Sequence, residues 1–264
     1  MATSDTTAAP AAKKAKTVPP GTPLFTDIDV SKMIFDATLQ GQEIKHVTVK
    51  YGGERLAFQL EPATGSLRVP FGFDDGSKFG GKASLNIELP SPQLAFFKDE
   101  LEAKVKYAAV EHKEAWFGAI KPIPSDDTVR ASFNSRIKTD ETGKYTPTLK
   151  VNVNLSEGPK KVLVQTSRRL ADGKITKPQP ATVDAVDRGS RVVPVLRTAG
   201  GVWISVNAKK KSFEYGIVFE AHELLVVEET EAGSSLNFGG MEVASDAEEP
   251  STFGDAGADG AEGA

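Results

Sequence analysis

Residues 148–155 read TLKVNVNL, and this run of alternating apolar and polar side chains indicates the fold class of the chain. Its two sets of side chains are Leu149, Val151, Val153 and Leu155 on one side and Lys150, Asn152 and Asn154 on the other. Because successive side chains of a β-strand point to opposite faces of a sheet, the run predicts a strand with one buried and one solvated face. Turn sequences at 140–143 and 156–159 bound the strand on both sides.

Similar runs before and after this strand predict a chain built mostly of short strands. They lie at 46–51, 55–60, 67–73, 83–89, 129–137, 162–165, 192–196, 201–206 and 217–227. Gly52 and Gly53 separate the first two runs and predict a hairpin turn between them. Residues 171–180 are mostly polar and predict an exposed loop.

One segment has the spacing of a helix instead. Its apolar residues recur every three or four positions, at Leu94, Phe97, Leu101, Val105 and Ala108. The spacing predicts a helix over 92–113, with Ser91 as its N-cap and Pro92 as its first residue. Many strands around one mid-chain helix favour an all-β fold, an OB-like Greek-key barrel with one inserted helix. A jelly roll fits the number of strands nearly as well but gives the helix no place.

Composition divides the chain into three parts. Residues 1–22 offer almost nothing to bury and predict a disordered arm, whereas 23–229 hold the strands and predict an OB-like nucleic-acid-binding domain. Residues 230–264 are rich in Gly, Ala, Ser and acids, which predicts a disordered acidic tail. No apolar run is long enough to span a membrane and no secretory signal is evident, so we expect a soluble intracellular protein, in a host cell if the chain is viral.

The formal net charge of −4 hides a strong asymmetry along the chain. Residues 220–264 carry 12 of the 36 acidic residues and none of the 32 basic ones, which leaves residues 1–219 with a net charge of +8. Residues 130–211 alone carry 17 basic and six acidic residues. A basic body joined to an acidic tail indicates a protein that binds nucleic acid or another polyanion.

The residues needed for common enzyme chemistry are missing. There is no cysteine, and the three histidines, His46, His112 and His222, are far apart in the sequence. No glycine-rich phosphate loop or nucleophile elbow is present. The acid pairs Asp74-Asp75 and Asp126-Asp127 adjoin turn residues, so we interpret them as turn acids. The sequence therefore predicts a protein that is not an enzyme and that has no metal and no cofactor.

A single-strand binder needs cations for the phosphates and exposed aromatic rings on which bases stack. Residues 116–215 supply both types, although we expect most of their aromatic rings to be core. Tyr145 is the best exposed candidate because it follows a turn and has a lysine neighbour, whereas Trp203 lies within a predicted strand and could equally be core. The candidate DNA-binding residues are Arg130, Arg136, Lys138, Lys144, Tyr145, Lys150, Lys160, Lys161, Arg168, Arg169 and Trp203.

The acidic tail has a predicted role of its own. A tethered polyanion beside a basic groove has a high effective concentration, so it can compete with nucleic acid or recruit basic partner proteins. Phe253 is a lone aromatic residue among small and acidic ones, which suits docking into an apolar pocket. The candidate partner-binding residues of the tail are Glu248, Glu249, Phe253, Asp255, Asp259 and Glu262.

The last predicted strands carry a family resemblance. Residues 189–195 (GSRVVPV), 201–204 (GVWI), 213–219 (FEYGIVF) and 222–227 (HELLVV) resemble the closing strands of the OB-fold single-stranded-DNA-binding proteins of short-tailed phages. They also resemble related proteins of large DNA viruses of algae and protists, and residues 116–118 (WFG) after the helix fit the same pattern. Two features depart from it, since phage members typically end in an aromatic residue, whereas Phe253 is 11 residues from the end, and the N-terminal arm is long.

The resemblance implies a non-catalytic protein that protects single-stranded DNA during replication, recombination and repair. It also implies that the tail recruits a polymerase, helicase or primase. Two alternatives remain open, a structural or capsid-associated β-protein of a virus and a histone or nucleic-acid chaperone. The sequence leaves open a homodimer, the choice between DNA and RNA, and the size of the binding site.

Overall fold

The computed structural model describes residues 22–36, 39, 44–60, 65–77, 81–170 and 174–229. The chain divides into two units, Met1–Thr230 and Glu231–Ala264, and the fold described below is that of the first unit. The expected acidic tail, with Phe253 and the five acids named above, lies outside the described residues, as does the expected arm up to residue 21. None of the described helices is long and apolar enough to cross a membrane.

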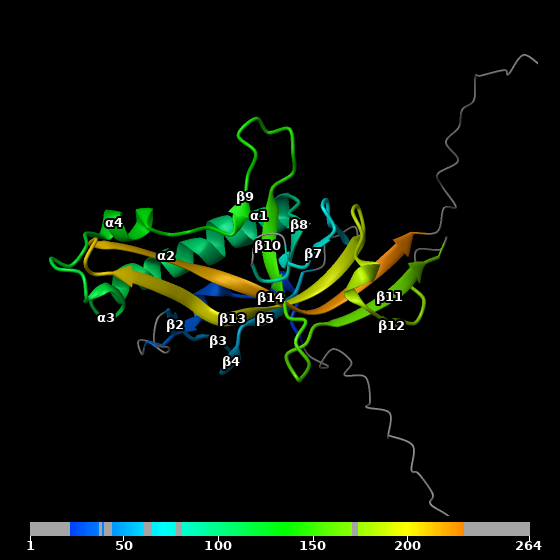
Figure 1. Cartoon of the computed structure of the whole chain (residues 1–264), viewed down its shortest axis with the longest axis horizontal. Helices are drawn as coiled ribbons and strands as arrows, with labels where there is room; N and C mark the ends of the chain where they lie inside the picture. Colours follow the sequence, from blue (N-terminus) through cyan, green and yellow to red (C-terminus); the bar gives the residue numbers. More distant parts are fainter. Residues whose placement is uncertain are drawn as a thin grey trace, which may run out of the picture. The chain divides into compact units, whose positions relative to one another are not determined.

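Two long strands organise the sheet. β13 (Arg191–Asn207) and β14 (Ser212–Glu229) form an antiparallel hairpin that runs the length of the sheet in Figure 1. The sequence predicted two separate strands at 192–196 and 201–206, and this was wrong because a β-bulge carries β13 through the glycines between them. The register shifts between Thr198 and Val202, where Gly200 and Gly201 have φ angles of +80° and +91°.

The remaining strands add to both edges of this hairpin. Along one edge the order is β14-β10-β8-β7, and β11 and β12 extend the same edge towards the C-terminal end of β14. On the other edge β13 pairs with β2, β5 and β6, β9 pairs with β10, and a separate small sheet has the order β1-β3-β4. The bounds are β1 Ile34–Phe35, β2 Lys45–Val47, β3 Val49–Tyr51, β4 Glu54–Arg55, β5 Ala57–Gln59, β6 Leu67–Arg68, β7 Phe73–Asp74, β8 Ser84–Glu88, β9 Ile137–Lys138, β10 Thr148–Val153, β11 Leu163–Arg169 and β12 Gln179–Ala181.

The predicted predominance of β-structure is confirmed, and so is the hairpin turn at Gly52-Gly53, which joins β3 to β4. Each strand pairs with the next in the order β8, β10, β14, β13 and β6. No ladder joins β6 back to β8 in the part of the chain that the structure describes, although Arg68 of β6 pairs with Glu88 of β8 at 3.2 Å. The closed Greek-key barrel therefore stays a prediction.

The expected helix is present with an irregular middle. It consists of α1 (Ser91–Ala95), a π-helical turn (Phe96–Leu101) and α2 (Glu102–Glu111), and α3 (Lys113–Phe117) follows it directly. Pro90 takes the N-cap position, so Ser91 and Pro92 each lie one position further into the helix than predicted. A Pro at the second helical position costs no hydrogen bond because the first N–H groups of a helix have no partner within it.

The predicted strand at 129–137 was wrong over most of its length. Its first residues belong to α4 (Asp126–Ala131), and only β9 at its end is extended. Ser125 caps α4 by accepting a hydrogen bond from the Thr128 N–H at 3.3 Å, and Asp126 and Asp127 occupy the first turn. These capping signals favour a helix and outweigh the β-propensity of Val129.

Aromatic side chains fill the space between the helix and the inner face of the sheet. Phe97 packs edge-on against Phe219 of β14 with ring centroids 5.3 Å apart, and Phe96 packs against Phe58 of β5 at 5.4 Å. As expected, most of the rings within 116–215 are core, since Trp116, Phe117, Phe213 and Tyr215 are buried. The inner face is therefore closed by apolar packing, which leaves the polar side chains of the sheet on its outer face.

Candidate nucleic-acid interface

The outer face of β8 and β10 is polar along its whole length. Lys150 and Asn152 of β10 are half-buried and alternate with Leu149, Val151 and Val153, which are buried against the core. Asn86 of β8 lies opposite Lys150 in the ladder and adds an amide to the same face. The alternation predicted from TLKVNVNL is thus confirmed for 148–153, whereas Leu155 lies beyond the end of β10 and is exposed. The solvated side carries one lysine, two amides and, at the end opposite Thr148, the carboxylate of Glu88.

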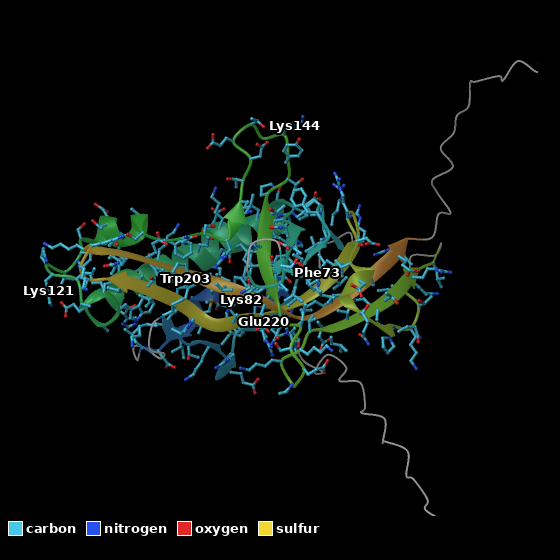
Figure 2. The ribbon with its side chains drawn as sticks, viewed as in Figure 1. Phe73, Lys82, Lys121, Lys144, Trp203 and Glu220 are labelled. Atoms are coloured by element: carbon cyan, nitrogen blue, oxygen red, sulfur yellow. The ribbon has the colours of Figure 1, made fainter. Side chains whose placement is uncertain are left out.

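A hollow of about 720 Å³ lies at the C-terminal end of β10. We call it the basic groove, because four cations from four separate segments line it: Arg55, Lys82, Lys160 and Arg197. Its acid is Glu220 of β14, which pairs with Arg197 at 3.2 Å and leaves the groove with an excess of three positive charges. Figure 2 labels Lys82 and Glu220 close to the crossing of β10 with the long hairpin.

Residues of the β13 bulge, Thr198, Ala199 and Gly200, form one wall of the basic groove. A Cβ atom at Gly201 would lie 2.0 Å from the backbone oxygen of Val47, so only glycine lets β13 approach β2 this closely. A Cβ atom at Gly200 would lie 3.2 Å from Nδ1 of His46, which also lines the groove. The bulge therefore brings a histidine ring and a backbone turn to the edge of the cationic surface.

His46 and Trp203 are neighbours across the β2–β13 ladder. Burial lowers the pKa of His46 below its usual range, and the charge of Lys82 lowers that pKa further, so the ring is neutral at pH 7. Trp203 is half-buried and lies opposite Gly216, where a Cβ atom would come within 3.1 Å of the indole Nε1. Trp203 is therefore neither fully core nor fully exposed; its indole nitrogen is buried, and the residue does not line the basic groove.

A second hollow of about 510 Å³ lies at the other end of the β8–β10 face. We call it the tyrosine pocket, and the residues that matter in it are Arg68, Glu88, Lys144, Tyr145 and Arg191. The side chain of Tyr145 is 65% exposed, which places it at the surface as expected. Figure 2 labels Lys144 in the loop between β9 and β10, which projects away from the sheet.

The structure brings some of the candidate residues together and separates others. Lys144, Tyr145, Lys150 and Lys160 lie along the β8–β10 face or in its two hollows. Arg136 and Lys138 flank this face at β9, where Arg136 is half-buried and its Nε lacks a hydrogen-bond partner. Trp203 lies beside the basic groove through its ladder neighbour His46.

Four candidates lie elsewhere or have acidic partners. Arg130 is on α4 and pairs with Asp127 at 3.5 Å, and Lys161 pairs with Glu157. Arg168 is on β11 and pairs with Glu228 at 3.7 Å, while the guanidinium of Arg169 packs beside Gly65. These residues share the basic stretch of sequence but line neither hollow, so their predicted contacts with DNA stay predictions.

Sequence reasoning missed three of the four cations of the basic groove. Arg55 and Lys82 lie before residue 130, outside the most basic stretch, and Arg197 lies between the predicted strands at 192–196 and 201–206. Lys82 immediately precedes the predicted strand at 83–89, which is the one local signal that could have pointed to it. Among the described residues, no cluster of three or more His, Cys, Asp or Glu side chains could hold a metal ion.

Comparisons with known proteins give structural likenesses only. No family model matches the sequence, and no curated protein matches it. The chain is similar to gp2.5, a single-stranded DNA binding protein encoded by bacteriophage T7, with 16% identity and a TM-score of 0.40 over 75% of this chain and 100% of that chain. It is also similar to the single-stranded DNA-binding protein from bacteriophage Enc34 in complex with ssDNA, with 14% identity and a TM-score of 0.37 over 72% of this chain and 93% of that chain.

Both solved structures belong to the class that the sequence resemblance names, the single-stranded DNA-binding proteins of phages. At these identities and TM-scores the likeness assigns neither a family nor a function to this chain.

Proposed function

We propose that this chain is a non-catalytic protein that binds single-stranded DNA along the outer face of β8 and β10. One observation carries the proposal: this polar face connects two cation-lined hollows, the basic groove and the tyrosine pocket. The exposed ring of Tyr145 stands in the pocket at one end, and at the other end the half-buried Trp203 is the ladder neighbour of His46, which lines the groove. Cations that follow a backbone and rings on which bases stack are the two needs of a single-strand binder.

The dimensions of this face suit one strand of nucleic acid. The six residues of β10 span roughly 20 Å, and two neighbouring strands of a sheet are about 4.8 Å apart. Along this face the phosphates would meet Lys150 and, at one end, the cations of the basic groove. Asn86 and Asn152 between them can donate or accept hydrogen bonds without adding charge.

The salt dependence of binding tests this proposal. The affinity for a fluorescent oligo-dT should fall linearly with salt concentration on logarithmic axes, with a slope of about −0.7 for each phosphate contact. Lys82→Gln, Lys150→Gln and Lys160→Gln should each reduce the steepness by about 0.7. Lys121→Gln is the control, because Lys121 is exposed in the turn after α3, away from both hollows, and should leave the slope unchanged.

The outcome also separates the alternative functions. If wild-type protein has no affinity for oligo-dT, the proposal is wrong and a structural β-protein is favoured. A preference for histones or other basic proteins over DNA would favour a chaperone. If the groove variants leave the slope of affinity against salt concentration unchanged, the basic groove is not part of the binding site. Competition with oligo-rU decides between DNA and RNA.

We further propose that the chain acts in DNA replication, recombination and repair, and that its parts are an arm at 1–22, a DNA-binding domain at 23–229 and an acidic tail at 230–264. The charge asymmetry of the sequence supports a tail that competes with DNA for the basic body. Partners such as a polymerase, helicase or primase would be recruited through the acids of the tail and Phe253. A pull-down with full-length protein and with the Phe253→Ala variant tests this recruitment.

A further inference from the structure

Several hydrogen bonds in the loop between β9 and β10 end on one carboxylate. Oδ2 of Asp140 accepts hydrogen bonds from Oγ1 of Thr142 at 2.5 Å, from the backbone N–H of Lys144 at 2.8 Å and from that of Tyr145 at 3.2 Å. The backbone N–H of Gly143 donates to the carbonyl oxygen of Asp140 at 3.0 Å, and its φ of +67° closes the turn. These hydrogen bonds lower the pKa of Asp140, which keeps the carboxylate charged at neutral pH.

The carboxylate fixes the backbone of the two residues that reach the tyrosine pocket. With both N–H groups held, Lys144 and Tyr145 project from a defined stretch of chain and not from a freely moving loop. Nζ of Lys144 lies 5.5 Å from the centroid of the Tyr145 ring, which leaves the rest of this largely exposed ring for a ligand. Arg68 and Arg191, which are opposite each other in the β6–β13 ladder, line the same pocket.

We propose that Asp140 is a positioning residue that holds Lys144 and Tyr145 as a preformed clamp for one nucleotide of the bound strand. Tyr145 stacks on the base, while Lys144, Arg68 and Arg191 hold the neighbouring phosphates. This inference rests on the proposed function, because it names how one end of the same site recognises single-stranded nucleic acid. A loop that is ordered before binding loses less conformational entropy when the ligand arrives, so the order itself contributes to affinity.

For the loss of the Asp140 side chain, the clamp predicts a change in DNA affinity opposite to the change that charge alone predicts. Asp140 is an acid beside a cationic pocket, so removing its charge would strengthen phosphate binding if only long-range electrostatics mattered. If Asp140 acts by holding the loop, removing it weakens binding although the site becomes more positive. Glu141 provides a matched control, because it is the adjacent exposed residue with the same charge.

The test compares oligo-dT binding by full-length wild-type protein and the variants Asp140→Ala, Asp140→Asn and Glu141→Ala. Asp140→Ala should weaken binding about threefold to tenfold, a fraction of what the loss of a stacked base costs. The affinity of Asp140→Asn should lie between those of Asp140→Ala and wild type, since its amide oxygen can still accept hydrogen bonds from the two backbone N–H groups. Glu141→Ala should leave the affinity unchanged or slightly raise it.

A double variant isolates positioning from any direct effect of Asp140 on the DNA. In a Tyr145→Ala background, Asp140→Ala should cause a smaller loss than it does in wild type, because the ring is already gone and only Lys144 is left to be positioned. An iodouracil-substituted oligonucleotide should crosslink to Tyr145 of wild type under light, with the site mapped by mass spectrometry. The yield of this crosslink should be lower in Asp140→Ala. Thermal melting confirms that each variant is folded.

The results separate this inference from the proposed function. Absence of oligo-dT binding by wild type would contradict the proposed function itself. If wild type binds oligo-dT and Asp140→Ala binds it as tightly as Glu141→Ala or more tightly, the positioning role is overturned. The proposed function is left standing. Additive losses in the double variant would also overturn it, because they would show that Asp140 acts independently of Tyr145.

Discussion

Two tyrosines of this protein have similar exposure but different surroundings. Tyr145 is 65% exposed and Tyr107 is 59% exposed, and each has a lysine amino group within 6 Å of its ring. Tyr145 lies in a pocket with two arginines, whereas Tyr107 is on α2, outside both hollows. Exposure alone therefore does not identify a stacking residue, and the neighbouring cations make the difference.

Tyr145→Ala should weaken the binding of oligo-dT by about 1–3 kcal/mol, the typical cost of losing one stacked base. Tyr107→Ala is the matched control and should leave affinity unchanged, because no cation-lined hollow adjoins its ring. Fluorescence anisotropy at fixed salt measures both. Equal effects of the two substitutions would show that Tyr145 has no special part in binding.

His46 makes the basic groove sensitive to pH. Its lowered pKa reflects burial first and then Lys82, while Arg55, Lys160, Arg197 and the paired Glu220 complete the charges that line the groove. Phosphates entering the groove offset these positive charges, so the pKa of His46 is higher in the complex than in the free protein. The complex then binds more protons than the free protein, and affinity rises as the pH falls.

The affinity for oligo-dT should therefore increase between pH 7.5 and pH 5.5, by up to about tenfold for each unit by which binding raises the pKa. His46→Gln should remove this dependence, and His112→Gln, at the end of α2, should keep it. The stability of the free protein should change in the opposite sense, because a lowered histidine pKa means that the unfolded chain binds the proton more readily as pH falls. A pH dependence that survives in His46→Gln would assign the effect to another group.

The bulge in β13 shows how one pair of residues shapes a long strand. Gly200 and Gly201 absorb the register shift against β14 and let β13 continue past β5 to pair with β2. The ladder with β14 continues to Thr198 before the shift and resumes at Val202 after it, so one strand spans both predicted segments. The bulge thus connects strand geometry to the candidate site.

Gly201→Ala should destabilise the fold more than Gly53→Ala does. Both glycines have nearly the same positive φ, +91° and +88°, so the conformational cost of about 1–3 kcal/mol is common to the two. They differ in space, since a Cβ atom at Gly53 meets nothing within 4 Å, whereas one at Gly201 would overlap the oxygen of Val47. Thermal or urea unfolding measures the difference, and equal losses would show that β13 moves away from β2 at little cost.

The last segment of the chain and the rest of it have net charges of opposite sign. Deleting residues 232–264 removes seven acids and no bases, which changes the formal net charge from −4 to +3. The basic groove, Lys150 and the tyrosine pocket all lie before this segment. The proposed competition between tail and DNA would therefore be electrostatic, between two parts of one chain.

The truncated protein should bind oligo-dT more tightly than full-length protein, with the largest gain at low salt, where the Debye length is long. A full-length variant with the seven acids replaced by their amides should behave like the truncation, because it removes charge and keeps length. Phe253→Ala should leave DNA affinity unchanged. An unchanged low-salt affinity in the truncated protein would contradict self-competition.

Local patterns were enough to predict several features of this protein. The alternation in TLKVNVNL gave the two faces of β10, the spacing of Leu94 to Ala108 gave the long helix, and the turn before Tyr145 gave its exposure. The predicted strand at 129–137 failed where a capping signal at Ser125 competed with β-propensity. Each of these results depends on residues a few positions apart, whose side-chain direction follows from backbone geometry alone.

The basic groove could not be predicted in this way, because its four cations come from segments far apart in the chain. Arg55 and Lys82 reach Lys160 and Arg197 because β13 and β14 pair with partners from both halves of the sequence. A sheet hydrogen bond forms between any two strands whose edges meet, whatever their separation along the chain. Composition and periodicity therefore determined most of the strands, the long helix and the charge asymmetry, while the pairing of distant strands determined which charges became neighbours.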